Sequence, residues 1–147
     1  MKTIQARCLW ANKEIFHAYH DQEWGRPSHD DKTHFEFLVL ESAQAGLSWE
    51  IILRKREGYK RAFSNFNTQI ISKYGNKEQK QLLLNPNIVR NKLKINATIN
   101  NAKKFLIIQN EFGSFSKYIW SFVKNFPINY KIKSESDRIA FSDTSDK

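Results

Sequence analysis

The sequence has few of the features that mark secreted or membrane-bound proteins. Its single cysteine, Cys8, cannot form a disulfide within the chain, which agrees with a reducing compartment. The N-terminal residues 1–7 lack the apolar segment of a secretory signal peptide. No apolar run approaches the roughly 18 residues needed to cross a membrane. We therefore expect a cytoplasmic protein with no membrane partner.

Several common catalytic signatures are also missing. The chain has no glycine-rich loop that could hold phosphates, and no order of serine, histidine and aspartate that suggests a catalytic triad. It also lacks an obvious second carboxylate for paired acid–base catalysis. These absences leave isolated acids, aromatic residues and cations as the candidate functional groups.

The composition predicts one globular domain with a polyanionic partner. The chain has 147 residues, of which 40% are hydrophobic, enough for a single domain with a moderate core. Lysine and arginine total 24 against 15 acids, a formal net charge of +9. Such a balance favours nucleic acid or an anionic membrane as partner, although a merely basic soluble protein would look similar. Aromatic residues make up 14%; next to cations they suit base stacking, but most must be core.

The hydrophobic pattern predicts a compact all-α fold. A central helix is expected from about 31 to 45, capped within Ser28–Asp31 and ended by Gly46. Ser48 is expected to cap the next helix, which Gly58 could interrupt. Further helices are expected at about 68–75, at 76–84 with a capping box of Asn76 and Gln79, and from 115 to Phe126–Pro127. A long helix is expected at about 91–111, with an apolar face of Ile95, Ile99, Ala102 and Leu106. Residues 1–30 show little periodicity, and 128–132 alternate as a short strand would.

A helix–turn–helix near residues 82–96 is a candidate DNA contact. Asn85–Asn87 breaks the first helix, and Arg90, Lys92 and Lys94 lie at the start of the second. Backbone N–H groups and nearby cations of such a hairpin can hold DNA phosphates. An ordinary corner between two helices has the same pattern, so the turn alone leaves both interpretations open.

Cys8 and His20 are possible metal ligands, but a structural zinc site normally needs four. The spacing matches no self-contained zinc finger, and a buried cysteine near a hydrogen-bonded histidine is the simpler interpretation.

Glu41 is the most unusual residue, because it is a carboxylate in an otherwise apolar helix. A buried charge is costly unless it is paired or used, so Glu41 is either a structural hydrogen-bonding group or a functional acid. The aromatic residues Trp10, Tyr19, Trp24 and Trp49 could form the walls of a slot for a flat ligand. A carboxylate at the end of such a slot would suit a cationic heterocycle.

Six stretches taken together resemble the bacterial DNA-3-methyladenine glycosylase I family, in order and spacing, over nearly the whole chain. They are Cys8–Trp10, Tyr19–Gly25, Leu40–Trp49, Leu53–Glu57, Ile88–Ile95 and Trp120–Val123. The resemblance implies the all-α helix-hairpin-helix glycosylase fold. It also implies base-excision repair, in which a monomeric enzyme hydrolyses the N-glycosidic bond of 3-methyladenine in alkylated double-stranded DNA.

The resemblance also assigns roles to residues. Glu41 matches the pocket glutamate that contacts the base, and Tyr19 and Trp49 match aromatic pocket residues. Trp10 and Trp24 match tryptophans near the pocket, while Phe16 stands where the family usually has a pocket tyrosine.

The family's structural zinc would take Cys8 and His20 as two of its four ligands. The other two lie further downstream than Lys147, so we expect a single glycosylase domain, residues 1–147, that lacks the family's C-terminal segment and holds only a partial zinc site. The alternative is a truncated, catalytically impaired derivative that still binds DNA.

Overall fold

The computed structural model describes residues 7–128, and these are helical and contain no strand. The elements are η1 (Leu9–Ala11), α1 (Glu14–Gln22), α2 (Asp31–Gln44), α3 (Trp49–Ala62), η2 (Ser64–Phe66), α4 (Thr68–Ile71), α5 (Asn76–Leu84), α6 (Lys92–Phe112) and α7 (Phe115–Ser121). The all-α prediction is therefore confirmed. Ile128 is not in a strand, and the rest of the expected strand and the C-terminal tail lie outside the described residues.

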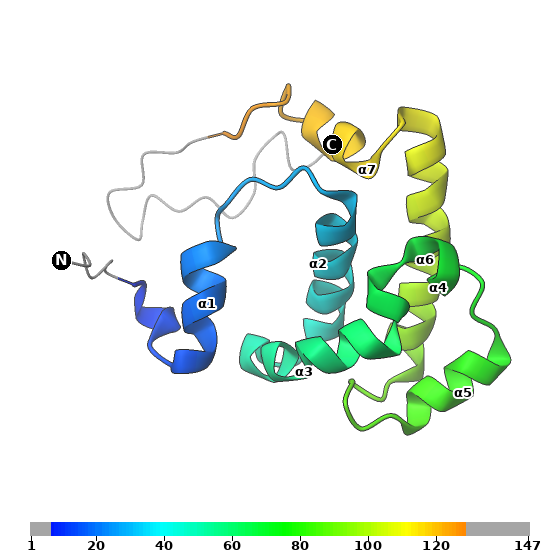
Figure 1. Cartoon of the computed structure of the whole chain (residues 1–147). Helices are drawn as coiled ribbons and strands as arrows, with labels where there is room; N and C mark the ends of the chain where they lie inside the picture. Colours follow the sequence, from blue (N-terminus) through cyan, green and yellow to red (C-terminus); the bar gives the residue numbers. More distant parts are fainter. Residues whose placement is uncertain (1–6, 129–147) are drawn as a thin grey trace.

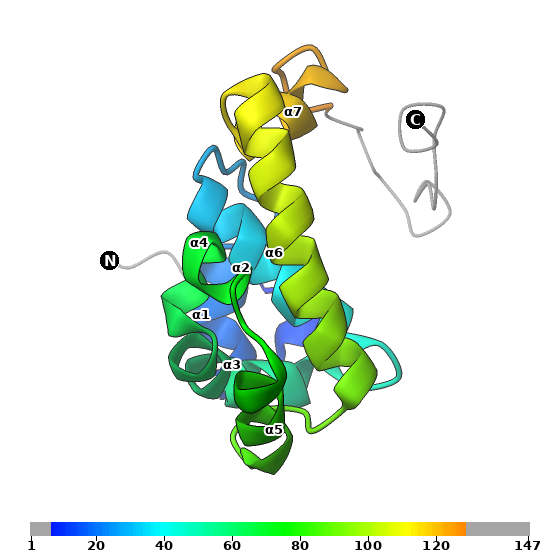
Figure 2. The same cartoon turned by 90° about the vertical axis from the view of Figure 1, so that its right-hand side faces the viewer.

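Helix α2 stands at the centre of this arrangement (Figure 1). It lies between α1 and the long helix α6, and α3 runs across its C-terminal end. Figure 2 shows α6 spanning the molecule from α7 to the region of α5. No helix within residues 7–128 is both long enough and apolar enough to cross a membrane.

The helix starts follow the polar residues that the sequence placed there. Asp30 caps α2, because its Oδ2 accepts a hydrogen bond from the backbone N–H of Thr33 at 2.8 Å. Ser48, Asn67 and Asn91 cap α3, α4 and α6 in the same way. These side chains satisfy N–H groups that have no partner within the helix, so the boundaries are set locally.

Three expectations about helix boundaries were wrong. The cap of α5 is Gly75, whose N–H donates to the Glu78 carboxylate at 2.8 Å, so the expected pair of Asn76 and Gln79 was placed one residue too late. Gly58 does not interrupt α3, which continues to Ala62. Helix α7 ends at Ser121 and not near Phe126, because the chain turns through positive φ at Lys124 and Asn125.

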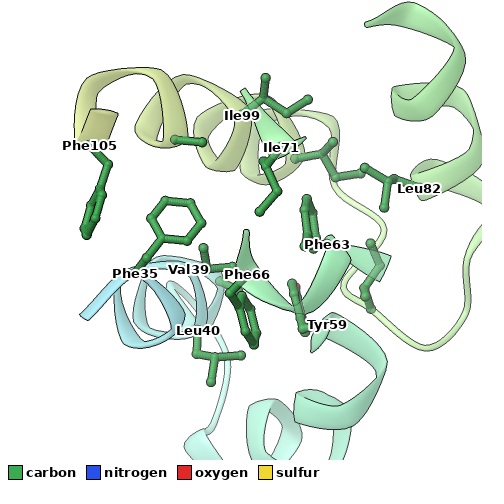
Figure 3. Packing of buried hydrophobic residues seen from close by; sticks show 14 of the residues in the cluster. Phe35, Val39, Leu40, Tyr59, Phe63, Phe66, Ile71, Leu82, Ile99 and Phe105 are labelled. Carbon is green, nitrogen blue, oxygen red and sulfur yellow. The ribbon is translucent and has the colours of Figure 1, made fainter. Parts of the chain in front are cut away.

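The core joins α2, α3, η2, α4, α5 and α6 (Figure 3). Phe35 of α2 meets Phe105 of α6 edge to face at a centroid distance of 5.2 Å, and both are buried. The expected apolar face of α6 is confirmed for Ile95, Ile99 and Ala102. Its last position was predicted to be Leu106, but Phe105 fills the core there and Leu106 is only partly buried.

Helix α1 is attached to this core in a different way, since none of its residues is buried. Ion pairs join it to the other helices: Arg56 of α3 binds Glu23 at the end of α1 at 2.8 Å, and Lys13 at its start binds Glu50 at 2.6 Å. The wall of side chains that α1 presents is therefore held by charges and aromatic contacts rather than by a hydrophobic core.

Candidate active site

A cavity of about 330 Å³ lies between α1, α2 and α3. It is lined by six side chains: Trp10, Tyr19, Trp24, Glu41, Gln44 and Trp49. Five of these were singled out from the sequence as pocket residues, and the fold brings them together from four separate segments. Gln44 was not, although it lies three residues after Glu41 on the same face of α2, a spacing that could have indicated it.

A tight turn fixes the two helices that form one side of the cavity. Leu47 N–H donates to Gln44 O at 2.6 Å. Ala45 has φ −45° and ψ 116°, and Gly46 has φ +75°. These values describe a type II turn, which needs a residue that tolerates positive φ at its third position. Gly46 meets that need, and the turn places Glu41 of α2 and Trp49 of α3 on the same cavity.

The aromatic residues contact one another and build a continuous wall. Trp10 packs edge-on against Trp24 with ring centroids 5.1 Å apart. The ring centroid of Tyr19 lies 5.3 Å from that of Trp49 and 6.2 Å from that of Trp10. Such rings present electron-rich faces that attract a cation. A flat, positively charged ligand would therefore find both apolar area and electrostatic attraction here.

Glu41 is the acid of this cavity. Its side chain forms no hydrogen bond or ion pair with any residue of 7–128, and desolvation by the surrounding protein raises the pKa of its carboxyl. The pKa of Tyr19 is also raised, first by burial and then by the negative charges of Glu41 and Glu23. Tyr19 thus stays a neutral hydrogen-bond donor, and Glu41 stays free to pair with a ligand.

Phe16 and His20 lie behind the wall rather than on the cavity. Phe16 packs edge-on against Trp10 at 5.9 Å and does not line the pocket. His20 stacks on Trp24 with centroids 5.4 Å apart and an interplanar angle of 22°. Both residues support the tryptophans from behind, so they shape the cavity without lining it.

The residues described here do not by themselves form a zinc site. The His20 Nε2 atom accepts a hydrogen bond from Cys8 N–H at 3.3 Å, and Nδ1 lies 2.9 Å from Asp21 Oδ1. This places Cys8 and His20 side by side, as a shared metal would require. Within residues 7–128, however, no group of three or more histidines, cysteines or acids is arranged to hold a metal. Two candidate ligands do not fill a four-ligand site.

The three cations predicted to contact DNA differ in their exposure and in their contacts with the protein. Arg90 and Lys92 are exposed in the α5–α6 hairpin and form no ion pair with the described residues. Lys94 is partly buried, and its ammonium donates to Ala43 O at 2.8 Å and Ala45 O at 2.7 Å. Within the part of the chain that the structure describes, Arg90 and Lys92 therefore have no ion-pair partner, while Lys94 points back into the protein.

A sequence model of the family described as methyladenine glycosylase matches residues 10–147. The chain belongs to the methyladenine glycosylase family. It is 40% identical over 126 residues to the DNA-3-methyladenine glycosylase of Haemophilus influenzae, covering 85% of this chain and 68% of that protein. It is 38% identical over 122 residues to DNA-3-methyladenine glycosylase 1 of Escherichia coli, covering 82% and 65%. The matches thus span about two thirds of the length of these relatives.

Solved structures of methyladenine glycosylases have the same fold. A 3-methyladenine DNA glycosylase I variant in complex with 3-methyladenine superposes with a TM-score of 0.89 at 37% identity, covering 95% of this chain and 76% of that chain. The Staphylococcus aureus enzyme, studied for its recognition of 3-methyladenine, gives 0.86 at 39% identity, covering 90% and 71%. This agreement extends the family assignment from sequence to fold.

Proposed function

We propose that this protein is a base-excision-repair DNA glycosylase that hydrolyses the N-glycosidic bond of 3-methyladenine in alkylated DNA. The observation that carries the proposal is Glu41, a partly desolvated acid on an aromatic cavity of about 330 Å³ that pairs with none of residues 7–128. The family relatives bear the name of this activity, and one structure holds 3-methyladenine.

The chemistry of the lesion fits these side chains. Methylation at N3 makes the adenine cationic while it is still attached to the sugar, so the base leaves readily and needs little acid catalysis. The aromatic faces of Tyr19 and Trp49 attract the cationic ring. The Glu41 carboxylate pairs with its charge and stabilises the positive charge that develops on the sugar as the bond breaks.

Water is the nucleophile in this proposal. No lysine lines the cavity, so the described residues offer no amine for attack on the sugar. The enzyme would therefore be monofunctional and release the free base, leaving an abasic site. The base must leave the DNA stack to enter the cavity, as in other enzymes that act on bases.

The α5–α6 hairpin is the proposed DNA contact, in the manner of a helix-hairpin-helix. The N-terminus of α6, capped by Asn91, favours a phosphate through its free N–H groups and dipole. Arg90 and Lys92 supply exposed cations beside it. We further expect the enzyme to act as a monomer in the cytoplasm.

Zinc remains a separate proposal. Cys8 and His20 would be its ligands in this chain, and a metal bound there would fix η1 to α1 beside Trp10 and Trp24. Metal analysis of the purified protein tests this: one zinc per chain, lost in Cys8→Ser, supports it, and a metal-free protein of full thermal stability contradicts it.

The activity is tested with methylated duplex DNA and the purified 147-residue protein. We expect free 3-methyladenine to be released, and Glu41→Gln to lower the single-turnover rate about 100-fold or more. Glu111→Gln, an exposed acid in the last turn of α6, serves as the control. DNA binding without base release, under conditions where the Haemophilus relative is active, would favour the impaired DNA-binding derivative instead.

A further inference from the structure

Lys94 forms a long-range contact that its place in the sequence does not suggest. It lies in the first turn of α6, yet its Nζ atom reaches the C-terminal end of α2. There it donates to Ala43 O at 2.8 Å and to Ala45 O at 2.7 Å, 51 and 49 residues earlier in the chain. One ammonium thus joins the start of the DNA-contacting hairpin helix to the end of the helix that carries Glu41.

The two acceptors belong to the turn that shapes the cavity. Ala43 is in the last turn of α2, where carbonyl groups have no partner within the helix. Ala45 is the second residue of the type II turn from Gln44 to Leu47. This turn connects Glu41, one helical turn before it, to Trp49 just after it. A donor bound to both carbonyls therefore limits how far these two cavity walls can move apart.

The stability of α6 does not explain a lysine at this position. A cation in the first turn of a helix interacts unfavourably with the helix dipole. The local contacts hold its backbone in place instead: Lys94 N–H donates to Asn91 Oδ1 at 3.1 Å, and Thr98 Oγ1 donates to Lys94 O at 3.0 Å. The favourable interactions of the Lys94 ammonium are with the C-terminal end of α2, where the helix dipole and free carbonyl groups favour a cation.

The same geometry argues against Lys94 as a phosphate ligand. A lysine ammonium has three N–H donors, and two of them are used within the protein. Arg90 and Lys92 are exposed and free of ion pairs among the described residues, whereas Lys94 is partly buried. Its charge is directed toward α2 rather than outward from the hairpin.

We propose that Lys94 is a positioning residue that fixes the Gln44–Leu47 turn, and with it the spacing of Glu41 and Trp49, when the hairpin holds DNA. This inference rests on the proposed glycosylase function for its catalytic consequence. It assigns Lys94 a role distinct from that of Arg90 and Lys92, although all three cations lie within five residues of one another.

Three lysine variants separate the two roles. Lys94→Met removes the ammonium and keeps a long unbranched side chain, Lys92→Met removes a proposed phosphate contact, and Lys103→Met removes an exposed charge from the same helix far from the hairpin. Duplex DNA affinity is measured across salt concentrations, and base release is measured in single turnover at saturating enzyme.

We expect Lys94→Met to lower the single-turnover rate about tenfold to 100-fold, because small displacements of catalytic groups have such effects. Its salt dependence should match that of the wild type. Lys92→Met should reduce the slope of log affinity against log salt by about one. Lys103→Met should leave the release rate unchanged. A Lys94→Met protein with a normal release rate and a slope reduced like that of Lys92→Met would overturn the inference.

If Lys94→Met does not fold, Lys94→Arg tests the same inference. Arginine retains the charge but spreads its donors over a planar fork, so a positioning role predicts a lower release rate with an unchanged salt slope. A phosphate role predicts that both stay at the wild-type value.

A measurement that does not depend on catalysis tests the role of Lys94 separately from the proposed glycosylase activity. The indole N–H resonance of Trp49, assigned with Trp49→Phe, should shift in Lys94→Met and not in Lys103→Met. If the wild-type protein releases no base, the proposed function fails while this shift still supports the contact. An unshifted resonance in a folded Lys94→Met protein contradicts the positioning role.

Discussion

Arg56 and Glu23 form a two-pronged ion pair in which Nη1 and Nη2 each donate to one carboxylate oxygen at 2.8 Å. The Nε–H of the same guanidinium donates to Glu36 at 2.7 Å. Burial disfavours the Arg56 charge, but the two carboxylates outweigh it and raise the pKa of the guanidinium. One arginine thus joins α3 to α2 and to the end of α1, which has no buried residue of its own.

Arg56→Met should therefore loosen the α1 side of the cavity. It leaves two partly buried acids unpaired, and we expect a loss of about 2–3 kcal/mol in the free energy of unfolding, somewhat less than for a fully buried pair. Urea denaturation measures this loss. Arg54→Met, on the same helix, breaks only an exposed pair with Glu50 and should lower the free energy of unfolding far less. Equal losses in the two variants would show that Arg56 has no special role.

We expect the ionised carboxylate of Glu41 to lower the stability of the folded protein at neutral pH. Because desolvation raises the pKa of its carboxyl above the ordinary value of 4.5, the folded protein binds this proton more tightly than the unfolded chain. The contribution to stability is present at low pH and is lost as pH rises through the raised pKa. Glu41→Gln should thus raise the melting temperature at pH 7, and the gain should shrink as pH falls.

The activity should have the opposite pH dependence. In the proposed mechanism base release requires the ionised Glu41 carboxylate, so the wild-type rate should fall as pH drops through the same raised pKa. Rate–pH profiles with a pre-methylated substrate check this. A rate that stays constant down to pH 4.5, with folded protein, would exclude an essential Glu41 anion.

Gly58 tests how closely α3 approaches the hairpin. A Cβ atom added there would lie 2.2 Å from Asn87 O, a backbone atom that cannot easily move away. Alanine normally stabilises a helix interior by about 1 kcal/mol over glycine. Here we expect Gly58→Ala to destabilise the protein by about 1–3 kcal/mol through overpacking, and to weaken DNA binding by displacing the hairpin.

Lys60→Ala is the control, because Lys60 is an exposed residue of the same helix and its side chain packs against no part of the hairpin. Its unfolding free energy should change by less than about 0.5 kcal/mol. A Gly58→Ala protein as stable as this control would mean that the α3–hairpin contact readily relaxes.

The features that could be predicted from the sequence are those that depend on residues close together in the chain. The caps Asp30 and Ser48 each bind an N–H three residues later in the chain, so their pattern is visible without the fold. Glu41 could be singled out because a carboxylate is unusual in an otherwise apolar helix. The family resemblance then matched Tyr19 and Trp49 to aromatic residues of the same pocket.

The sequence did not predict features that depend on distant contacts. Helix α1 was missed although Ile15, Phe16 and Tyr19 share one face, because it has only nine residues and none of them is buried. Lys94 looked like Arg90 and Lys92 because its partners lie about 50 residues away. Arg56 was likewise only one residue of a basic run until the fold brought Glu23 and Glu36 to it.

Asp31 provides a test of how α7 is held. Its carboxylate accepts hydrogen bonds from Gln109 Nε2 at 2.6 Å, from Phe115 N–H at 2.9 Å and from Ser116 N–H at 2.7 Å. It thereby ties the start of α2 to α6 and to the first turn of α7. Burial works to raise the pKa of Asp31, but these donors outweigh it and lower the pKa below the ordinary value of 3.8.

Asp31→Asn should therefore destabilise the protein in a pH-dependent way. An amide cannot replace both carboxylate oxygens as acceptors, so we expect a loss of about 2–3 kcal/mol at pH 7. A lowered folded pKa means that the carboxylate stabilises the fold above pH 3.8 and loses this effect as pH falls through the folded pKa. The difference between variant and wild type, measured by urea denaturation, should shrink toward pH 3. Asp30→Asn, at an exposed cap where asparagine serves as well as aspartate, should change stability by only a few tenths of a kcal/mol. A loss that did not vary with pH would show that the charge of Asp31 contributes nothing to anchoring α7.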